Sequence, residues 1–327
     1  MSGTQEIAEL AAGALRSWGG GAKPPRLVKW RENVVFDVRL AQGRRIALRL
    51  HRPGYQTRAS IEAELQWTAL LAAAGQPVPA PVPALDGART VTAGDRIASA
   101  VAWLPGSPIG SAEHPLPGTP AERRALMGRL GRLIAEVHAA TDSLAAARHL
   151  ARPAWDRDGL LGERPLWGRF WENPAFSVSE RGLIAEARSE AARRLADLAA
   201  GGADFGLIHA DCLRENVLSD RDGLALIDFD DSGWGFRMYD LATAVVQGLE
   251  EPGVGDHAQA VLEGYASVRS VGPSPGGTLT LFLMLRAFAS AGWIMGRASG
   301  GDPRLGFYAD RAVRMARMVL SGRAICG

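Results

Sequence analysis

The sequence predicts an α+β fold with two lobes, a small antiparallel-sheet lobe followed by a mainly helical lobe. Short apolar runs separated by turn residues fill residues 26–103. Long patterns with a helical period dominate beyond residue 120. Between them, "LPGSPIGSAEHPLPGTP" is dense in Pro and Gly, which is typical of a boundary. We therefore expect an N-lobe over 1–104, ending in a hinge, and a C-lobe over 105–327.

The composition narrows the class of protein. The 327 residues suffice for two domains, and 47% hydrophobic with 22% charged residues is ordinary for a globular chain. A net charge of +2, spread along the chain, argues against a nucleic-acid partner. Two cysteines, Cys212 and Cys326, cannot build a disulfide framework, so we expect a cytoplasmic location. Arg286 interrupts the apolar run 279–296, which favours a buried core helix over a membrane partner.

In the N-lobe, the sequence predicts a short amphipathic helix near the start and then strands that alternate in polarity. In the third strand, Arg49 lies on the face opposite the aliphatic residues. The helix after it has Ser60 as a candidate cap and Gly75 at its end. The expected strands are 26–30, 33–40, 44–52, 89–93 and 95–103, and the expected helix is 60–75.

In the C-lobe, periodic apolar positions predict a series of helices around two short strands. The first short strand leads into "HADCLRENV", and the second ends in "IDFDD". The expected helices are 122–141, 179–200, 239–250, 256–268, 278–299 and 304–322.

The two short strands carry the polar residues that indicate chemistry. Asp211 and Asn216 follow the first strand, and Asp228 ends the second, so we expect them to converge on one cleft. Phosphoryl transfer requires metal ions on the phosphates and a carboxylate to accept the proton of the acceptor hydroxyl. Mg²⁺ prefers oxygen ligands from one or two side chains plus the phosphates. Asn216 and Asp228 supply such oxygens, which leaves Asp211 to face the hydroxyl.

The spacing of His209, Asp211 and Asn216 is that of a protein-kinase catalytic loop. The stretch "LIHADCLRENVL…LALIDFDDSGWGFRMYDLATAV" resembles the aminoglycoside phosphotransferase superfamily, which also holds choline kinases, type II homoserine kinases and stress response kinase A. "RENVVFDV", "LRLHRP", "GRLIAEVHAAT" and "PLWGRFWENP" resemble its homoserine-kinase-like branch. The resemblance covers about residues 26 to 300 and implies a protein-kinase-like fold that uses ATP and Mg²⁺.

The resemblance also implies a role for each matching residue. Asp211 matches the catalytic base, and Asn216 and Asp228 match the metal ligands. Arg49 would hold the phosphates of the nucleotide, and Glu64 would orient Arg49. Asn33 and the backbone of Ala102 and Leu104 would also contact the nucleotide. His209 and Asp240 would support the catalytic loop.

The chain departs from the protein-kinase pattern in three ways. Arg49 replaces the usual Lys, and Arg is a wider, forked donor. No G-x-G-x-x-G lies between residues 26 and 40. About a dozen residues separate Asp228 from Asp240, which leaves no room for an activation segment. A Ser/Thr protein kinase of the stress response kinase A type stays open as an alternative, as does a catalytically silent nucleotide-binding module.

The acceptor is expected to be the hydroxyl of a small molecule, such as an amino alcohol, a sugar or an aminoglycoside. Trp167 and Trp234 are candidates for the walls of its pocket, although tryptophans also serve as packing. Asp231 could hold an ammonium group, and Arg286 could hold either a buried carboxylate of the protein or an anionic acceptor group. The sequence leaves open the identity of the acceptor, the choice between ATP and GTP, and the oligomeric state.

Overall fold

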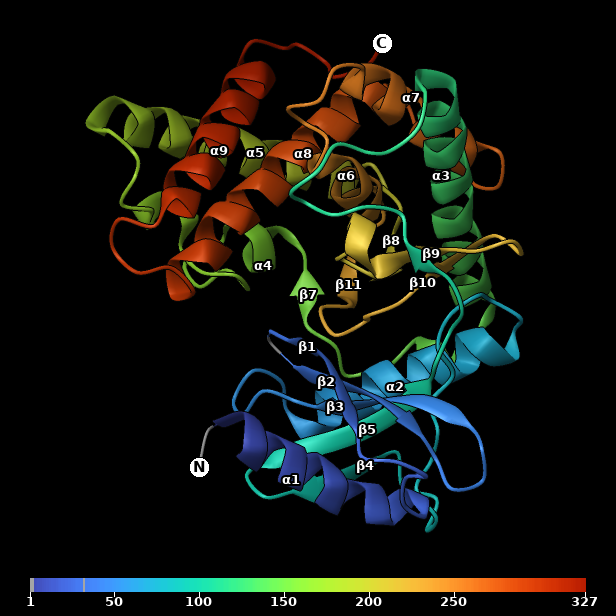
Figure 1. Ribbon diagram of the computed structural model, residues 1–327. Coiled ribbons are helices and arrows are strands. Elements are labelled where there is room, and N and C mark those ends of the chain that lie inside the picture. The colour runs from blue at the N-terminus through green and yellow to red at the C-terminus, as the bar shows by residue number, and fades with distance from the viewer. Residues whose placement is uncertain (1–2, 32) are drawn as a thin grey trace. The chain divides into compact units, whose positions relative to one another are not determined.

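The computed structural model describes residues 3–31 and 33–327 (Figure 1). The chain divides into two compact units. Unit 1 comprises Met1–Gly106, Leu144–Arg152 and Ala225–Asp230, and unit 2 comprises Ser107–Ser143, Pro153–Leu224 and Asp231–Gly327. Two short segments far along the chain thus belong to unit 1. The assignment of a nucleotide-binding N-lobe to 1–104 and an acceptor-binding C-lobe to 105–327 stays a prediction.

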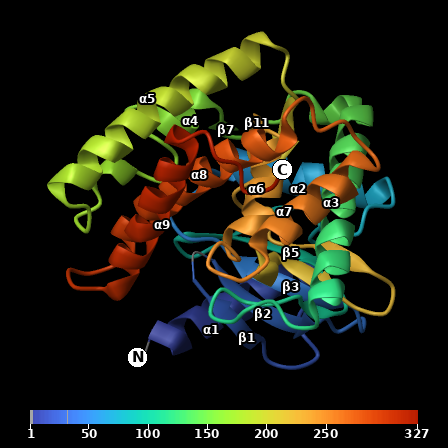
Figure 2. The same ribbon diagram turned by 90° about the horizontal axis from the view of Figure 1, so that it is seen from above.

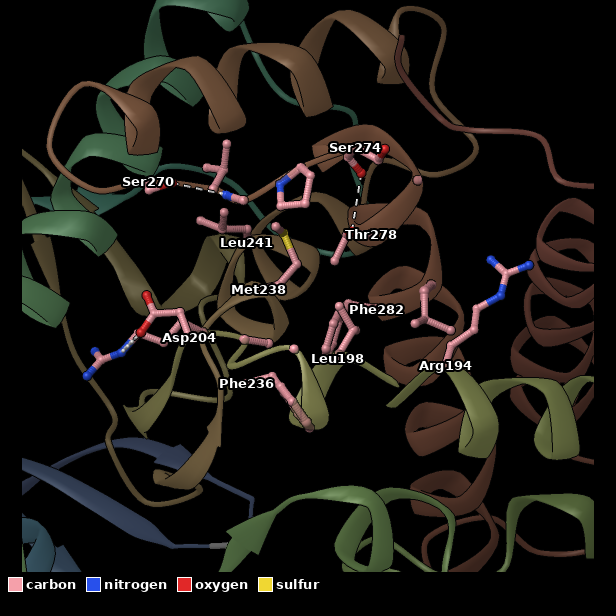
Figure 3. A pocket seen from close by; sticks show the side chains of 18 of the residues that line it. Arg194, Leu198, Asp204, Phe236, Met238, Leu241, Ser270, Ser274, Thr278 and Phe282 are labelled. Atoms are coloured by element: carbon pink, nitrogen blue, oxygen red, sulfur yellow. Dashed lines mark hydrogen bonds and ion pairs between the residues drawn. The ribbon is translucent and has the colours of Figure 1, made fainter. Parts of the chain in front are cut away.

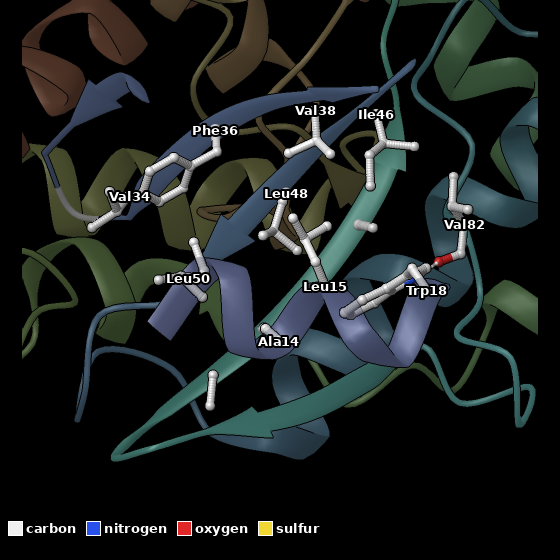
Figure 4. Close-up of a cluster of buried hydrophobic side chains, with 14 of the residues drawn as sticks. Ala14, Leu15, Trp18, Val34, Phe36, Val38, Ile46, Leu48, Leu50 and Val82 are labelled. Atoms are coloured by element: carbon white, nitrogen blue, oxygen red, sulfur yellow. Dashed lines mark hydrogen bonds between the residues drawn. The ribbon is translucent and has the colours of Figure 1, made fainter. Parts of the chain in front are cut away.

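Unit 1 is built on a five-stranded antiparallel sheet between two helices. The strand order is β1 (Arg26–Trp30), β2 (Val34–Arg39), β3 (Arg45–Leu50), β5 (Arg96–Ala102) and β4 (Thr90–Ala93). The helices are α1 (Gly3–Leu15), followed by the 3₁₀ turn η1 (Arg16–Trp18), and α2 (Arg58–Ala73). Side chains of α1 and η1 form a buried apolar cluster with one face of the sheet, including Ala14, Leu15, Trp18, Val34, Phe36, Val38, Ile46, Leu48 and Leu50 (Figure 4).

The alternation in β3 decides which way Arg49 points. Ile46, Leu48 and Leu50 have no exposed surface and belong to the cluster under α1. The intervening Ala47 instead packs with side chains of α2. Because successive side chains of a strand point to opposite faces, Arg49 lies on the α2 side of the sheet, as the sequence predicted.

The N-cap of α2 differs from the expectation by three residues. Thr57, and not Ser60, is the N-cap, and its side chain accepts a hydrogen bond from the Ser60 backbone N–H. Ser60 itself lies in the first turn and is buried. Both residues are of the capping type, so residue preference alone could not distinguish them.

Unit 2 is mainly helical, and its longer helices follow the expected ranges closely. The helices are α3 (Pro120–Ser143), α4 (Arg157–Leu161), α5 (Val178–Ala200), α6 (Met238–Val246), α7 (Val254–Ala266), α8 (Pro275–Trp293) and α9 (Pro303–Leu320). Short 3₁₀ turns are η2 (Ala145–Ala147, in unit 1), η3 (Phe170–Glu172), η4 (Arg214–Asn216) and η5 (Ile294–Gly296). With unit 1, these elements confirm the predicted α+β class.

Helices α3 and α7 lie side by side in both views (Figures 1 and 2), and glycines allow their close approach. A Cβ placed on Gly264 would lie 1.9 Å from the backbone oxygen of Gly128. A Cβ on Gly131 would lie 2.1 Å from the backbone oxygen of Val261. Two helix backbones can therefore contact each other directly only because these positions lack a side chain.

Helix α8 crosses the interior of unit 2. Together with η5 it is long and apolar enough to span a membrane by length and composition, but 83% of its most apolar window is buried within the protein. Arg286 near its middle is buried as well. The helix thus behaves as the buried core helix that the sequence predicted.

Short strands position the polar loops of unit 2. β8 (Phe205–Ile208) pairs antiparallel with β11 (Gly233–Phe236), which pairs parallel with β7 (Ala154–Trp155). β6 (Ser107–Pro108) pairs with β9 (Val217–Ser219). β10 (Leu224–Leu226) follows after a turn, and its residues from Ala225 onward belong to unit 1. The sequence did not predict β11, because its "GWGF" combines two strand-weakening glycines in four residues.

Candidate active site

The loop that follows β8 is held by the carboxylate of Asp240. Its oxygens accept hydrogen bonds from the backbone N–H groups of His209 (2.8 Å) and Ala210 (2.6 Å). Ala210 has a positive φ of 65°, which is unusual for a residue with a side chain. The two hydrogen bonds stabilise this backbone conformation directly before Asp211. The sequence predicted Asp240 as such a brace.

Asp240 is in turn held by a buried histidine. His138 Nε2 lies 3.0 Å from Asp240 Oδ2, and His138 Nδ1 lies 3.0 Å from the Tyr265 hydroxyl. Burial alone would raise the pKa of Asp240, but the hydrogen bond and charge of His138 and the loop contacts hold it below its usual value. Burial is also the main cause that lowers the pKa of His138. Sequence reasoning did not single out His138 or Tyr265, since each reads as an ordinary helix residue.

The side chain of Asp211 is oriented by Asn216. Asn216 Nδ2 donates to the Asp211 carboxylate Oδ2 at 2.8 Å and to the Asp211 backbone oxygen at 3.0 Å. Asn216 is 4% exposed. Because its amide nitrogen is turned toward Asp211, its oxygen Oδ1 points elsewhere, and an amide oxygen is a ligand type that Mg²⁺ accepts. The structure thus brings together two of the residues predicted from the "HADCLREN" spacing.

Arg286 reaches the same carboxylate from α8. Its NH2 lies 3.2 Å from Asp211 Oδ1, and its NH1 donates to the Ser290 hydroxyl at 2.5 Å. The guanidinium carbon also lies 4.6 Å from the ring centroid of Trp167. Of the two roles left open by the sequence, this geometry matches the pairing with a protein carboxylate.

Aromatic side chains gather beside this pair. Trp155 stacks on Tyr239 with ring centroids 5.3 Å apart and meets Trp167 edge-on at 5.2 Å. Its Nε1 donates to the backbone oxygen of Asp231 at 2.8 Å. Trp234 lies on β11, opposite Leu207 and Ala154. Trp155 and Tyr239 were missed by sequence reasoning, since no pattern separates them from core aromatics.

In unit 1, the cation predicted to hold phosphates is surrounded by carboxylates. Arg49 NH1 lies 2.5 Å from Glu64 Oε1, which is the predicted helix partner. Its NH2 lies 3.3 Å from Asp230 Oδ1 and 3.9 Å from Asp228 Oδ1. Burial works to lower the pKa of Arg49, but the three carboxylates outweigh it and the net pKa is raised. The guanidinium is therefore firmly charged.

Asp228 has the geometry of a special position. Its φ is 67°, in the left-handed region, and its side chain is 36% exposed. Lys29 on β1 approaches it, with Nζ 3.6 Å from Asp228 Oδ2. A half-exposed carboxylate next to cations suits a hard divalent ion carried by phosphates. Among residues 3–31 and 33–327, no three His, Cys, Asp or Glu side chains are grouped so as to hold a metal ion.

The remaining predicted nucleotide residues are placed as follows. Asn33, 8% exposed, accepts a hydrogen bond at its Oδ1 from the backbone N–H of Arg52 at 3.1 Å. The Ala102 N–H donates to the backbone oxygen of Ala80 at 2.8 Å. Leu104 follows the end of β5. The nucleotide roles of these three residues stay predictions.

The model of the phosphotransferase enzyme family matches residues 26–273. The chain belongs to this family. A Deinococcus radiodurans protein described as uncharacterized is 31% identical over 308 residues, which cover 90% of this chain and 84% of that protein. For this phosphotransferase, the prediction of a kinase-type transferase enzyme is confirmed.

Solved structures show the same fold. A microcompartment-associated aminopropanol kinase is 28% identical with a TM-score of 0.83, and the match covers 97% of this chain and 99% of that one. An amicoumacin kinase in complex with AMP-PNP, Ca²⁺ and its antibiotic is 18% identical, with a TM-score of 0.73 and coverage of 100% and 95%. A choline/ethanolamine kinase family protein of Mesorhizobium loti is 16% identical, with a TM-score of 0.63 and coverage of 96% and 99%. The protein-kinase-like fold class is thus confirmed.

These comparisons confirm the aminoglycoside phosphotransferase superfamily as a whole. The homoserine-kinase-like branch stays a prediction, as do the individual site residues, the magnesium ion and the cytoplasmic location.

A large cavity of the phosphotransferase lies elsewhere in unit 2. It measures about 1040 Å³, and none of the predicted site residues lines it. Leu198, Met238, Leu241 and Phe282 contribute apolar surface, and Arg194 and Asp204 stand on opposite sides (Figure 3). The arginines at its edge already pair with carboxylates: Arg194 pairs with Glu190, and Arg269 with Asp142 and Asp204. Size alone therefore does not make this cavity the active site.

Proposed function

We propose that this phosphotransferase moves the γ-phosphate of ATP to a hydroxyl group of a small molecule, with Asp211 as the catalytic base. The proposal rests on the way in which the backbone and the carboxylate of Asp211 are both fixed in position. Its backbone follows a strained turn fixed by Asp240, and its carboxylate is oriented by Asn216. A base fixed on both sides can meet an acceptor hydroxyl in one geometry, which is what a positioned proton acceptor requires.

The residues of unit 1 support the nucleotide part of the proposal. Arg49, oriented by Glu64, would bind phosphate oxygens through its fixed positive charge. Asp228 and Asn216 would hold Mg²⁺, an ion that neutralises charge on the phosphates when bound. The related amicoumacin kinase was solved with an ATP analogue and a divalent ion, which supports the same use here.

For the acceptor, we favour a small amino alcohol. The aminopropanol kinase covers nearly the whole chain at 28% identity, and an ethanolamine-kinase-family protein shares the fold. Trp167, which lies under the guanidinium paired with Asp211, contacts Trp155, and Trp155 stacks on Tyr239. Trp155 also donates to the backbone oxygen of Asp231, and aromatic faces together with a carboxylate suit an ammonium group. Arg286 is committed to Asp211 and Ser290, which argues against an acceptor that needs it for a carboxylate.

The test is a screen for acceptor-stimulated ADP release with ATP and Mg²⁺. Amino alcohols, sugars and aminoglycosides form three arms, and unrelated proteins form a fourth. We expect the largest kcat/KM among amino alcohols. Phosphorylation of several proteins with no active small molecule would replace the proposal by a protein kinase. Nucleotide binding without any transfer in all four arms would indicate a catalytically silent module.

The role of Asp211 is tested in the best arm of that screen. Asp211→Asn should lower kcat by about 10²–10⁴-fold, the usual effect of removing a positioned base, and should leave nucleotide affinity nearly unchanged. The matched control is Asp222→Asn, since Asp222 lies in the turn after β9 with a side chain that is 77% exposed. A kcat of Asp211→Asn within a few-fold of the control would refute the assignment.

A further inference from the structure

The chain contains two lysines, Lys23 and Lys29, although Lys and Arg together number 37. Lys23 lies exposed in the loop before β1. Lys29 lies on β1 and brings its Nζ to 3.6 Å from Asp228 Oδ2, with both side chains 36% exposed. One of two lysines in an arginine-rich chain thus contacts the carboxylate proposed to bind the metal.

The backbone of β1 contributes to this placement. Leu27 pairs with Phe36 and Lys29 pairs with Val35, so Val28 is an extra residue that makes a β-bulge. Bulges change the direction in which the following side chains point. Within β1, Lys29 is the one residue that is partly buried, whereas Leu27 and Val28 are exposed. The bulge therefore coincides with the residue that turns from solvent toward Asp228.

The charges around Asp228 suggest why a second cation is needed. Arg49 is 6% exposed, and its two terminal nitrogens already face Glu64 at 2.5 Å and Asp230 at 3.3 Å. A guanidinium shared between two carboxylates has little freedom to follow a phosphate group. An ammonium on a flexible stem can change partners more easily. Lys29 has this freedom, since its side chain is partly exposed.

We propose that Lys29 is a second phosphate-binding cation of the nucleotide site. This inference rests on the proposed function and adds a residue to it. Without nucleotide, the ammonium of Lys29 pairs with Asp228. With its carboxylate engaged in holding a divalent ion, Asp228 would no longer pair with Lys29, and the ammonium would be available to phosphate oxygens of the nucleotide. The exchange replaces one ion pair by another and involves no covalent step.

The first experiment uses the two lysines as probe and internal control. The intact protein is acetylated with an amine-selective reagent at limiting dose, and modification of Lys29 and Lys23 is quantified by mass spectrometry. The arms are buffer, Mg²⁺ alone, and Mg²⁺ with ADP or AMP-PNP at concentrations that calorimetry shows to be saturating. We expect nucleotide to slow acetylation of Lys29 by about tenfold relative to the Mg²⁺ arm, with Lys23 unchanged. Equal rates for Lys29 in all arms would overturn the inference.

The second experiment measures the Kd for Mg²⁺-nucleotide in variants. Lys29→Gln should raise the Kd by about tenfold, whereas Lys29→Arg should stay within about threefold of wild type, because it keeps the charge. Lys23→Gln is the matched control and should leave the Kd unchanged. Unfolding of Lys29→Gln by urea should match wild type, since an exposed ion pair contributes little to stability.

The outcomes separate this inference from the function on which it rests. If wild type binds no nucleotide, the proposed function fails, and the role of Lys29 fails with it. If wild type binds nucleotide while Lys29→Gln binds equally well and Lys29 stays unprotected, only the role of Lys29 is overturned. If Lys29→Arg loses as much affinity as Lys29→Gln, the charge is not the feature that matters, and the inference is again overturned.

Discussion

The carboxylate of Asp240 offers the sharpest test of how the catalytic loop is built. It is 1% exposed and accepts three hydrogen bonds, two from the loop backbone at His209 and Ala210 and one from His138. Asp240→Asn keeps one oxygen and places an NH₂ group where the other oxygen was. Oδ1 accepts one of these hydrogen bonds and Oδ2 accepts two, so the NH₂ causes the smaller loss at the Oδ1 position. There it faces the Ala210 N–H, so one hydrogen bond is lost and buried donors are left unpaired.

The magnitude follows from these contacts. A hydrogen bond to a charged group contributes about 1.5–3 kcal/mol, and an unpaired buried donor costs about 1–3 kcal/mol. We expect Asp240→Asn to lower the free energy of unfolding by about 2.5–6 kcal/mol in total. A loop displaced by even 1 Å commonly costs about 10²-fold in rate, so kcat should fall by about that factor. Nucleotide affinity should fall much less than kcat, because Arg49 and Glu64 belong to unit 1 and only the proposed metal ligand Asn216 lies on the displaced loop.

The assay combines urea unfolding, steady-state kinetics and calorimetric nucleotide binding on the same samples. Asp197→Asn is the control, since Asp197 is 67% exposed on α5 and pairs with a surface arginine. The control should match wild type in all three measurements. The reasoning is refuted if Asp240→Asn keeps a kcat within threefold of wild type, or if nucleotide affinity falls as much as kcat.

Three further predictions follow from other parts of the molecule. Asp228→Ala should raise the Mg²⁺ concentration needed for half-maximal rate by tenfold or more at saturating ATP, because it removes a full charge from the proposed ion site; an unchanged titration would count against that site. Gly264→Ala should destabilise the protein by more than about 1 kcal/mol, since its Cβ would meet the Gly128 oxygen at 1.9 Å, whereas Gly182→Ala on α5, with nothing within 4 Å, should stabilise it by roughly 0.5–1 kcal/mol; similar effects in urea unfolding would contradict this. His51 is buried, and burial first and a neighbouring guanidinium second hold its pKa well below 6.5. Below about pH 6.5, His51 therefore binds a proton in the unfolded chain but not in the folded chain. For this group, the free energy of unfolding should fall with falling pH by up to about 1.4 kcal/mol per pH unit. His51→Gln should make that slope shallower, and an unchanged slope would refute the prediction.

The sequence predicted the fold class and most elements because their signals are local. The alternation of aliphatic and other residues in β3 predicted the face of the sheet on which Arg49 lies, and Gly75 predicted the end of α2. The cap of α2 was misplaced because Thr57 and Ser60 are chemically equivalent candidates one turn apart. Strand β11 was missed because it is stabilised by pairing with β8, which is distant in the sequence, and the composition of β11 alone does not predict that contact.

For the site, the sequence predicted candidate residues and two of their partners, Asp240 and Glu64, but not the other contacts that hold them. The pairing of Asp211 with Asn216 follows from a five-residue spacing. The contacts of Asp211 with Arg286 on α8 and of Lys29 with Asp228 join residues 75 or more positions apart. Such pairs depend on packing of whole elements, so a single sequence does not reveal them.

The replacement of the usual Lys by Arg49 acquires a physical reason in this arrangement. A guanidinium presents several donors in a planar fork, so it can meet Glu64 with one nitrogen and Asp230 with another. A lysine ammonium is a single point charge and could not span two carboxylates in this fixed way. The Arg49 guanidinium is less mobile as a result, because a cation bound to two carboxylates cannot easily move with a phosphate group. A mobile ammonium close to Asp228, supplied by Lys29, restores the property that the substitution at position 49 gives up.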